Sequence, residues 1–289
     1  MERRTFLTLA AAGLAGALSE EEIKPAAEGS WTVQEVIDRI MAEIPPPHRD
    51  PTVDTLKIGS PEQRVSGIAT TFLATVPVIE RTAELGANLL IVHEPLYFNH
   101  LDEVDWLSED PVYEQKRELL EDKGIAVWRF HDHWHQVEPD PVREALAGDL
   151  GLTSESEIPG LYTIAPTSLE QLARTVKEKL GLPAVRIVGN PEMTCRTMGI
   201  LPGAFDSRLQ IKFLAEQPAD VLLIGETNEW ETNIWVEDAR ALGFRKSLLI
   251  LGHSDSEEPG MRILVPWLQK LFPGLPVQHV PTPQMFRYV

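Results

Sequence analysis

The hydrophobic and polar positions of the chain follow two alternating patterns, one typical of helices and one typical of buried strands. Between residues 31 and 44 the apolar residues fall at helical spacing, at Val33, Val36, Ile37, Ile40 and Ile44. Thr32 precedes this run and Glu35 follows three residues later, a pair typical of a helix N-terminus. The next two apolar runs, RVSGIATTF (64–72) and ANLLIVHEP (87–95), are short and dense, which predicts buried strands.

The same two patterns recur to the end of the chain. We expect further helices over 75–86, 111–124, 139–151, 168–181, 207–217, 232–243 and 261–274. We expect further strands over 125–131, 160–166, 184–189, 197–205, 220–226, 246–253 and 277–281. Strands that alternate with helices in this way predict an α/β fold with right-handed crossovers.

The order of the elements predicts two similar α/β halves. The first half covers residues 31–150 and the second covers 196–289, with a connecting strand-helix-strand segment over 151–195. The stretches ERTAELGANLLIVH and EDARALGFRKSLLILGH each contain a helix that ends in Leu-Gly, an apolar strand and a final histidine. Two explanations of this likeness are open: an internal duplication, or the helix and strand boundaries that βαβ units commonly share.

The first residues, MERRTFLTLAAAGLAGALS, have the features of an export signal rather than of a folded element. Arg3 and Arg4 precede a moderately apolar run with small residues near its end, which is typical of a twin-arginine signal over residues 1–19. An N-terminal amphipathic helix is the alternative. Residues 20–30 then form a polar linker. The signal predicts a periplasmic or extracellular location.

Composition and charge argue against some classes of binding partner. The net charge of −18 repels phosphate backbones and anionic lipids, so we expect neither nucleic acid nor a membrane surface as a partner after signal removal. No apolar run in the body of the chain is long enough to cross a membrane. Cys195 is the only cysteine, which excludes an internal disulfide, and its apolar neighbours predict a buried, inert thiol.

Histidine and carboxylate side chains gather at the ends of three predicted strands. His93 and Glu94 follow LLIV, the stretch FHDHWHQ (130–136) follows IAVWR, and His253 with Glu257 follows LLILG. Open α/β sheets place their sites at these carboxyl ends, and imidazole with carboxylate suits divalent first-row metals. If the third strand continued through FHDHWHQ, its alternate histidines would line one side. Each cluster taken alone is also explained as a polar strand end.

These segments resemble the NIF-three-like (NGG-interacting factor three) dinuclear metal-centre proteins, also called GTP cyclohydrolase I type 2 homologues. The resemblance covers residues 31–289 and is strongest at LLIVHEPLYF and LGHSDSEEPGM, with VDTLKIG (53–59) in support. It implies the short form of the family without an inserted domain, two divalent ions, and toroidal hexamers. It also implies a ligand set of three histidines and two carboxylates.

The chain departs from the family pattern at two positions. The family has two adjacent histidines at the first site, where this chain has His93 and Glu94. The family has an aspartate ligand in the third-strand motif, where this chain has His135. Because one change adds a carboxylate and the other removes one, the resemblance predicts the metal ligands His93, Glu94, His135, His253 and Glu257. The alternative is that the two changes abolished the site.

Four further polar residues lie in or near the segments that match the family. His131 matches a family histidine near the site, and Glu226 follows the strand DVLLIG, so both are candidates for general acid or base work. His133 has no family counterpart as a ligand, which favours an outer or solvent-facing role. Asp54 is kept in the segment that matches the family's Asp-Asn-Val-Gly-Leu stretch.

The resulting functional expectation is a metal-dependent hydrolase. Two divalent ions, with Zn, Mn, Fe and Co all suited to the ligands, would activate a bridging water for attack on a small-molecule substrate. No glycine-rich phosphate loop is visible, so GTP itself has little support from the sequence. The alternatives are a non-catalytic metal-binding scaffold of the same fold and an acidic binding module without metal.

Overall fold

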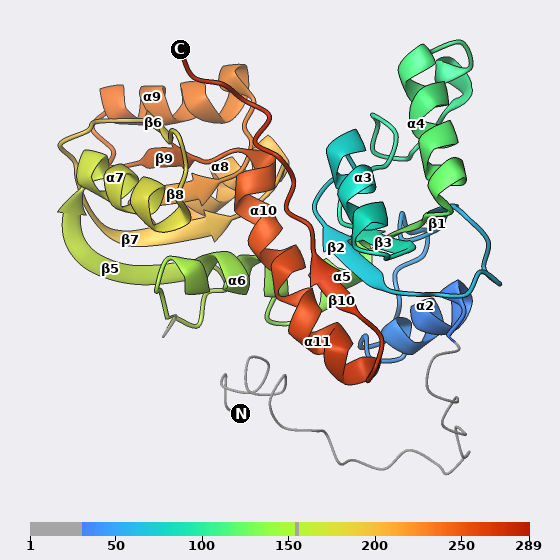
Figure 1. The fold of residues 1–289 in the computed structure, drawn as a ribbon. Helices are drawn as coiled ribbons and strands as arrows, with labels where there is room; N and C mark the ends of the chain where they lie inside the picture. Colours follow the sequence, from blue (N-terminus) through green and yellow to red (C-terminus); the bar gives the residue numbers. More distant parts are fainter. Residues whose placement is uncertain (1–30, 154–155) are drawn as a thin grey trace. The chain divides into compact units, whose positions relative to one another are not determined.

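The structure consists of two α/β units, each built around its own sheet. The computed structural model describes residues 31–153 and 156–289, so the expected signal (1–19) and linker (20–30) lie outside the described residues. The described residues divide into two compact units: those of 31–140 with Met261–Pro283, and those of 141–260 with Gln284–Val289. Each unit has its own five-stranded sheet (Figure 1).

The sheet of the first unit has the strand order β1-β4-β3-β2-β10. Its strands are β1 (Leu56–Ile58), β2 (Ile68–Thr71), β3 (Leu89–Val92), β4 (Ala126–Arg129) and β10 (Val277–His279). Strands β10, β2, β3 and β4 run parallel, and β1 pairs antiparallel with β4. The three central strands are buried on both faces, as parallel strands covered by helices must be.

The helices of the first unit lie on both sides of this sheet (Figure 1). They are α2 (Val33–Met41), α3 (Val76–Glu84), α4 (Pro111–Lys123), α5 (Asp132–Gln136) and α11 (Leu264–Leu271), with a 3-10 turn over Asp105–Leu107. Leu90, Val92 and Val127 belong to one core with Ile79 of α3 and Leu120 of α4. On the other face, the rings of Trp134 and Trp267 pack 5.8 Å apart, which ties α5 to α11.

The sheet of the second unit has the strand order β5-β7-β8-β9-β6. Its strands are β5 (Leu161–Ser168), β6 (Arg186–Val188), β7 (Thr194–Leu201), β8 (Val221–Ile224) and β9 (Ser247–Ile250). Strands β7, β8 and β9 run parallel, whereas β5 and β6 pair antiparallel at the two edges.

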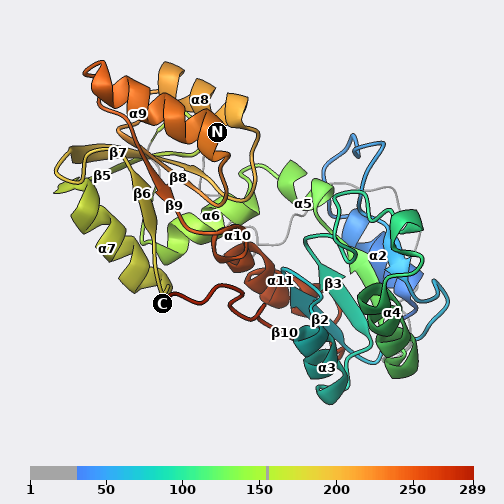
Figure 2. The same ribbon diagram turned by 90° about the horizontal axis from the view of Figure 1, so that it is seen from above.

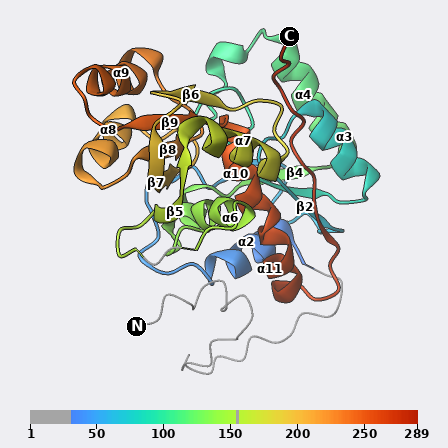
Figure 3. The ribbon, with the colours of Figure 1, turned by 90° about the vertical axis from the view of Figure 1, so that its left-hand side faces the viewer.

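Alternate residues of β8 pack against helices on opposite faces of the second sheet. Val221 and Leu223 pack in the core that includes α6 (Pro141–Asp149) and α7 (Leu169–Leu180). Leu222 and Ile224 pack in the opposite core, with α8 (Ser207–Glu216) and α9 (Ile234–Ala241). Figures 2 and 3 show these helices on the two sides of the strands. A π-helical turn over Glu229–Asn233 precedes α9, and α10 (His253–Arg262) follows β9.

The predicted α/β class is confirmed, but the boundaries between the halves differ from those expected. Helix α6, which we expected in the first half, belongs to the second unit. The expected connector over 151–195 supplies β5, α7 and β6, and both of these strands belong to the second sheet. Residues 261–283 return to the first unit, where β10 pairs with β2. These boundaries depend on strand pairing, which local periodicity does not encode.

Two local expectations are corrected at the strand ends. Strand β4 ends at Arg129, and residues 132–136 form the short helix α5 instead of a continued strand. The last helical region begins at His253, eight residues before the expected start at Met261, and contains Pro259. The first correction places His131 and His135 at helical spacing, and the second places His253 and Glu257 one helical turn apart.

Two further features of the structure are the burial of the Cys195 thiol and the length of the helices. Cys195 is fully buried, and burial raises the pKa of its thiol to about 11. Within residues 31–153 and 156–289, no helix combines the length and apolar character needed to cross a bilayer.

Candidate metal centre

Strand β3 delivers the first two candidate ligands of the first unit. His93 and Glu94 follow its last residue directly, and their backbone N–H groups donate to carbonyls at the end of β2 and just beyond it. Glu94 N lies 3.0 Å from Phe72 O, and His93 N lies 3.2 Å from both Thr71 O and Phe72 O. His93 is fully buried and Glu94 is 9% exposed. The strand end therefore fixes both side chains at the carboxyl edge of the sheet.

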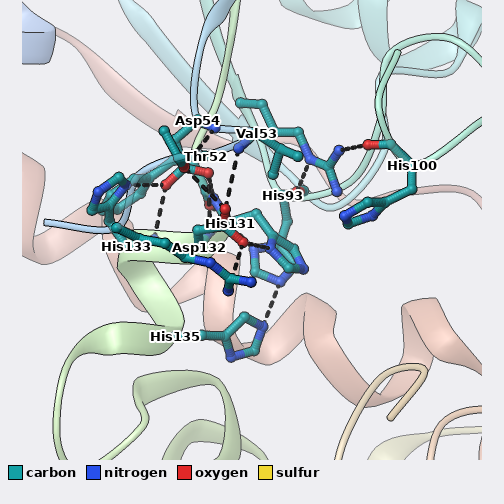
Figure 4. Close-up of polar contacts among 12 residues, drawn as sticks. Thr52, Val53, Asp54, His93, His100, His131, Asp132, His133 and His135 are labelled. Atoms are coloured by element: carbon teal, nitrogen blue, oxygen red, sulfur yellow. Dashed lines mark hydrogen bonds and ion pairs between the residues drawn. The ribbon is translucent and has the colours of Figure 1, made fainter. Parts of the chain in front are cut away.

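Two more candidate ligands, His131 and His135, lie at the short helix α5. His131 precedes the helix as its N-cap and His135 lies four residues on, so the two rings share one side of the turn. The fully buried carboxylate of Asp54 accepts the backbone N–H groups of His131, Asp132 and His133 at 2.8–2.9 Å. Figure 4 shows Asp54 beside the start of this turn, with His133 turned toward it. Asp54 thus satisfies the donors that a helix start leaves unpaired.

The rings of His93, His131 and His135 converge (Figure 4). Their centroids lie 4.7–5.0 Å apart, and one ring nitrogen from each lies within 4.8 Å of the others. The Nε2 atoms of His93 and His135 are 3.1 Å apart. Three imidazoles in this arrangement have the composition of a catalytic zinc site.

In each of the three rings, Nδ1 lies beside an oxygen that can accept a hydrogen bond but cannot donate one. The partners are the Phe130 carbonyl at 3.2 Å, Asp132 Oδ1 at 3.1 Å and Asp140 Oδ2 at 3.1 Å, for His93, His131 and His135 respectively. Nδ1 therefore carries the proton and donates it, and the lone pair lies on Nε2. This outer arrangement is typical of histidines that bind metals.

The donors fit a cation on electrostatic grounds. Two Nε2 lone pairs 3.1 Å apart repel each other unless a positive charge lies between them or one ring becomes an imidazolium. Burial lowers the pKa of His131, and the neighbouring His93 and His135 lower it further, although the bond to Asp132 and the Glu94 charge oppose this. The neutral, metal-binding form of His131 is thus favoured.

Asp132 is itself held as a carboxylate. Burial alone would raise its pKa, but hydrogen bonds from His131, the Val53 backbone and the Thr52 hydroxyl together lower it well below the usual range. Arg49 adds an ion pair at 3.2 Å. The carboxylate therefore remains an acceptor for His131 Nδ1 across the physiological pH range.

Glu94 pairs with a fully buried arginine. Arg129 donates from Nη2 to Glu94 Oε2 at 3.1 Å, from Nε to the His93 carbonyl at 3.0 Å and from Nη1 to the His100 carbonyl at 2.6 Å. The other oxygen, Glu94 Oε1, lies 3.5 Å from His131 Nε2. One oxygen of Glu94 is therefore anchored and the other faces the histidines.

The second unit holds its own cluster at the start of α10. His253 Nε2 lies 2.9 Å from Glu257 Oε2, one helical turn away, and His253 Nδ1 lies 3.2 Å from Glu226 Oε1. Glu257 is 3% exposed, whereas the side chain of Glu226 is 57% exposed. Glu226 thus faces the ring nitrogen opposite to Glu257, the same outer position that Asp140 has at His135.

A glycine makes room for Glu257. Gly203 has a φ of +75°, and a Cβ there would overlap Oε1 of Glu257 and lie 2.7 Å from its Cδ. The Ser256 hydroxyl accepts the Gly203 N–H at 2.8 Å and donates to the His253 carbonyl at 2.8 Å. The turn after β7 and the start of α10 are therefore locked together around the carboxylate.

A cavity of about 500 Å³ lies beside His135 in the first unit. Its lining consists of Pro47, His48, Arg49, Asp50, Asp132, His135 and Gln136. The guanidinium of Arg49 is 63% exposed, so the cavity offers one cationic group close to the imidazole cluster. A cavity of this size is enough for a small organic molecule.

The structure therefore groups the predicted residues in two sets. His93, Glu94, His131 and His135 lie together in the first unit, and Glu226, His253 and Glu257 lie together in the second. His133 is separate, because its Nδ1 lies 2.7 Å from Asp54 Oδ2.

Sequence reasoning missed the partners that orient these side chains. Arg129, Asp132 and Asp140 were not predicted to touch the ligands, and Asp54 was expected only in a family segment. Asp132 and Asp140 flank the histidine segment FHDHWHQ, but nothing in a linear pattern says which ring each would face. Arg129 is a charged residue inside an otherwise apolar strand, AVWR, and that anomaly is a usable signal.

Comparison with known proteins gives consistent results. A sequence model of the family described as Duf34/NIF3 (NGG1p interacting factor 3) matches residues 31–284. A protein of Clostridium perfringens named "GTP cyclohydrolase 1 type 2 homolog" is 24% identical over 217 residues, which cover 71% of this chain and 78% of the relative. A protein of the same name from Streptomyces coelicolor is 27% identical over 166 residues, 52% of this chain and 57% of the relative.

Solved structures share the fold. A Bacillus cereus protein related to NIF3 superposes with a TM-score of 0.72 at 17% identity, over 89% of this chain and 99% of the other. Reduced HcgD from Methanocaldococcus jannaschii gives a TM-score of 0.65 at 19% identity, over 88% and 99% of the two chains. At these identities the likeness establishes the fold alone.

Proposed function

Because the chain belongs to the DUF34/NIF3 family, whose model matches residues 31–284, we propose that it is a metal-dependent hydrolase with a dinuclear centre. The proposed ligands are those expected from the sequence: His93, Glu94, His135, His253 and Glu257. The curated relatives are named as homologues of a cyclohydrolase, which agrees with hydrolytic chemistry. The substrate class that we propose is a small molecule.

One observation carries the proposal. In His93, His131, His135 and His253, Nδ1 faces an oxygen of the protein, at distances of 3.1–3.2 Å. In His93 and His253 the opposite nitrogen, Nε2, faces another ligand atom at 3.1 and 2.9 Å. The Nδ1 contact alone is shared by His133, whose Nδ1 lies 2.7 Å from Asp54 Oδ2. The second contact at Nε2 sets His93 and His253 apart, because a metal ligand needs one ring nitrogen held by the protein and the other directed at the site.

The residues have distinct roles in this proposal. Divalent ions held by such ligands supply Lewis acidity and lower the pKa of coordinated water. The geometry favours His131 as an additional ligand over a general acid or base, because its Nδ1 proton is engaged by Asp132. Glu226 holds the Nδ1 proton of His253 and is exposed enough to exchange protons with solvent.

The ligand types narrow the choice of metal. Imidazole and carboxylate donors without a thiolate suit Zn, Mn, Fe and Co. The non-catalytic scaffold remains the alternative function of the same site. The cavity of about 500 Å³ beside His135 favours catalysis, because closed structural sites offer no space for a substrate.

Metal analysis of the natively purified full chain tests the proposal. We expect more than one divalent ion per chain by mass spectrometry, and His93→Ala should abolish most of this loading, because His93 lies at the centre of the imidazole cluster. Removal of metal with a chelator should lower the melting temperature, since an ion that binds only the folded chain stabilises it. A chain that carries less than about one ion and does not respond to chelation would contradict the proposal.

Location and assembly are also part of the proposal. The features of residues 1–19 support export by the twin-arginine route to the periplasm or beyond, and the resemblance supports a homohexamer. Large apolar side chains are exposed in both units, among them Trp106 (63%) and Trp230 (76%). Sedimentation of the purified protein should give a mass near six chains, and a monomeric mass would contradict the assembly.

A further inference from the structure

We infer that Asp140 is a positioning residue for metal binding, because its carboxylate holds the His135 ring with Nε2 turned toward His93. The inference rests on the proposed metal site and assigns to it a residue outside the ligand set. The geometry is contained within the first unit, to which Asp140, His135 and His93 all belong.

The contacts define the orientation of His135 on both edges of its ring. His135 Nδ1 donates to Asp140 Oδ2 at 3.1 Å, and Nε2 lies 3.1 Å from His93 Nε2. Asp140 is 6% exposed, so its carboxylate is held in a site of low solvent access. A buried carboxylate beside Nδ1 fixes the tautomer that leaves the lone pair on Nε2.

His135 depends on such a partner more than His93 does. His93 follows a buried central strand, and its Nδ1 donates to the backbone carbonyl of the neighbouring segment at 3.2 Å. His135 lies on a helix of five residues that ends at Gln136, and its side chain is 21% exposed. A ring on one short turn needs a fixed acceptor to keep one orientation.

A capping role is the competing explanation for Asp140. It directly precedes Pro141, the first residue of α6, and aspartate before an initial proline is a common helix start. The chain contains a matched case at Asp110, which precedes Pro111 of α4 and accepts from Val112 N and Tyr113 N at 3.0 and 2.9 Å. Asp110 touches no histidine of the site and therefore provides the control.

The test compares Zn²⁺ affinity and the visible spectrum of the Co²⁺-loaded full chain in matched variants. Asp140→Ala should weaken Zn²⁺ binding about 10–100-fold and shift the Co²⁺ bands, since the outer partner of a ligand is lost. Asp140→Asn retains an acceptor oxygen and should recover much of the affinity. Asp110→Ala should lower the melting temperature but leave the Zn²⁺ affinity and the Co²⁺ spectrum unchanged.

A double-mutant comparison gives a second readout. In the His135→Ala background, Asp140→Ala should cost little further Zn²⁺ affinity, because the ring that Asp140 positions is absent. Wild-type affinity and spectrum in Asp140→Ala would overturn the inference, as would an equal further loss of affinity in the His135→Ala background. Absence of Zn²⁺ and Co²⁺ binding by the wild-type chain would overturn the proposed function instead.

Discussion

Replacement of Arg129 by methionine should lower the free energy of unfolding by about 3–5 kcal/mol, because it removes the cation that neutralises a buried carboxylate. Arg129 is fully buried, and Glu94, 9% exposed, is bound to it at 3.1 Å. The change also removes the donors that the His93 and His100 carbonyls now accept. Urea unfolding of the chelator-treated protein measures the effect without a contribution from bound metal.

Two further variants test whether the buried Glu94 charge causes this loss of stability. Arg81 forms an ion pair with Glu84 at 2.8 Å on the surface of α3, with side chains 57% and 65% exposed. Arg81→Met should therefore change the stability by less than about 1 kcal/mol. The double variant Arg129→Met with Glu94→Gln should regain part of the lost stability. Equal losses in the Arg129 single and double variants would show that the carbonyl contacts and the ion pair with Asp102 at 3.8 Å, rather than the Glu94 charge, dominate.

Replacement of Gly203 by alanine should destabilise the second unit by about 1–3 kcal/mol from backbone strain alone. Gly203 has a φ of +75°, where a side chain is disfavoured. The added methyl group would also displace the Glu257 carboxylate, which is 3% exposed and held by His253 at 2.9 Å. We therefore expect weaker metal binding in addition to the loss of stability, measured by Zn²⁺ titration and urea unfolding.

Gly181 separates the two effects of that substitution. It follows α7 with a φ of +65°, and a Cβ there would meet no atom within 4 Å. Gly181→Ala should therefore show the backbone cost alone, with unchanged Zn²⁺ binding. If Gly203→Ala also left Zn²⁺ binding unchanged, Glu257 would have no part in holding the metal.

Most elements of the fold could be predicted from local patterns. The helix expected from Thr32 onward is α2, with the predicted capping box between Thr32 and Glu35. The apolar run LLIV is β3, and the Asp-Pro and Leu-Gly boundaries mark α4 and α3. These features are encoded locally, because caps and periodicity involve residues within a few positions of each other.

The direction of the histidine segment could not be predicted in this way. Alternate histidines after an apolar strand are typical of a continued strand, but residues 132–136 form a helix of five residues. So short a helix has no stability of its own. It forms because Asp54, 77 residues earlier in the chain, accepts the N–H groups at its start. That contact turns His131 and His135 to one side and His133 to the other.

The sequence by itself determined the α/β class, the family, and the residue types that end the strands with imidazole and carboxylate. These properties follow from local periodicity and from motifs of a few residues. Only the tertiary structure decided that Arg129 anchors Glu94, that Asp132 and Asp140 fix the tautomers of His131 and His135, and that residues 261–283 return to the first sheet. The physical reason is that buried charges and ring nitrogens take their partners from whatever the packed chain brings within about 3 Å, whatever their separation in sequence.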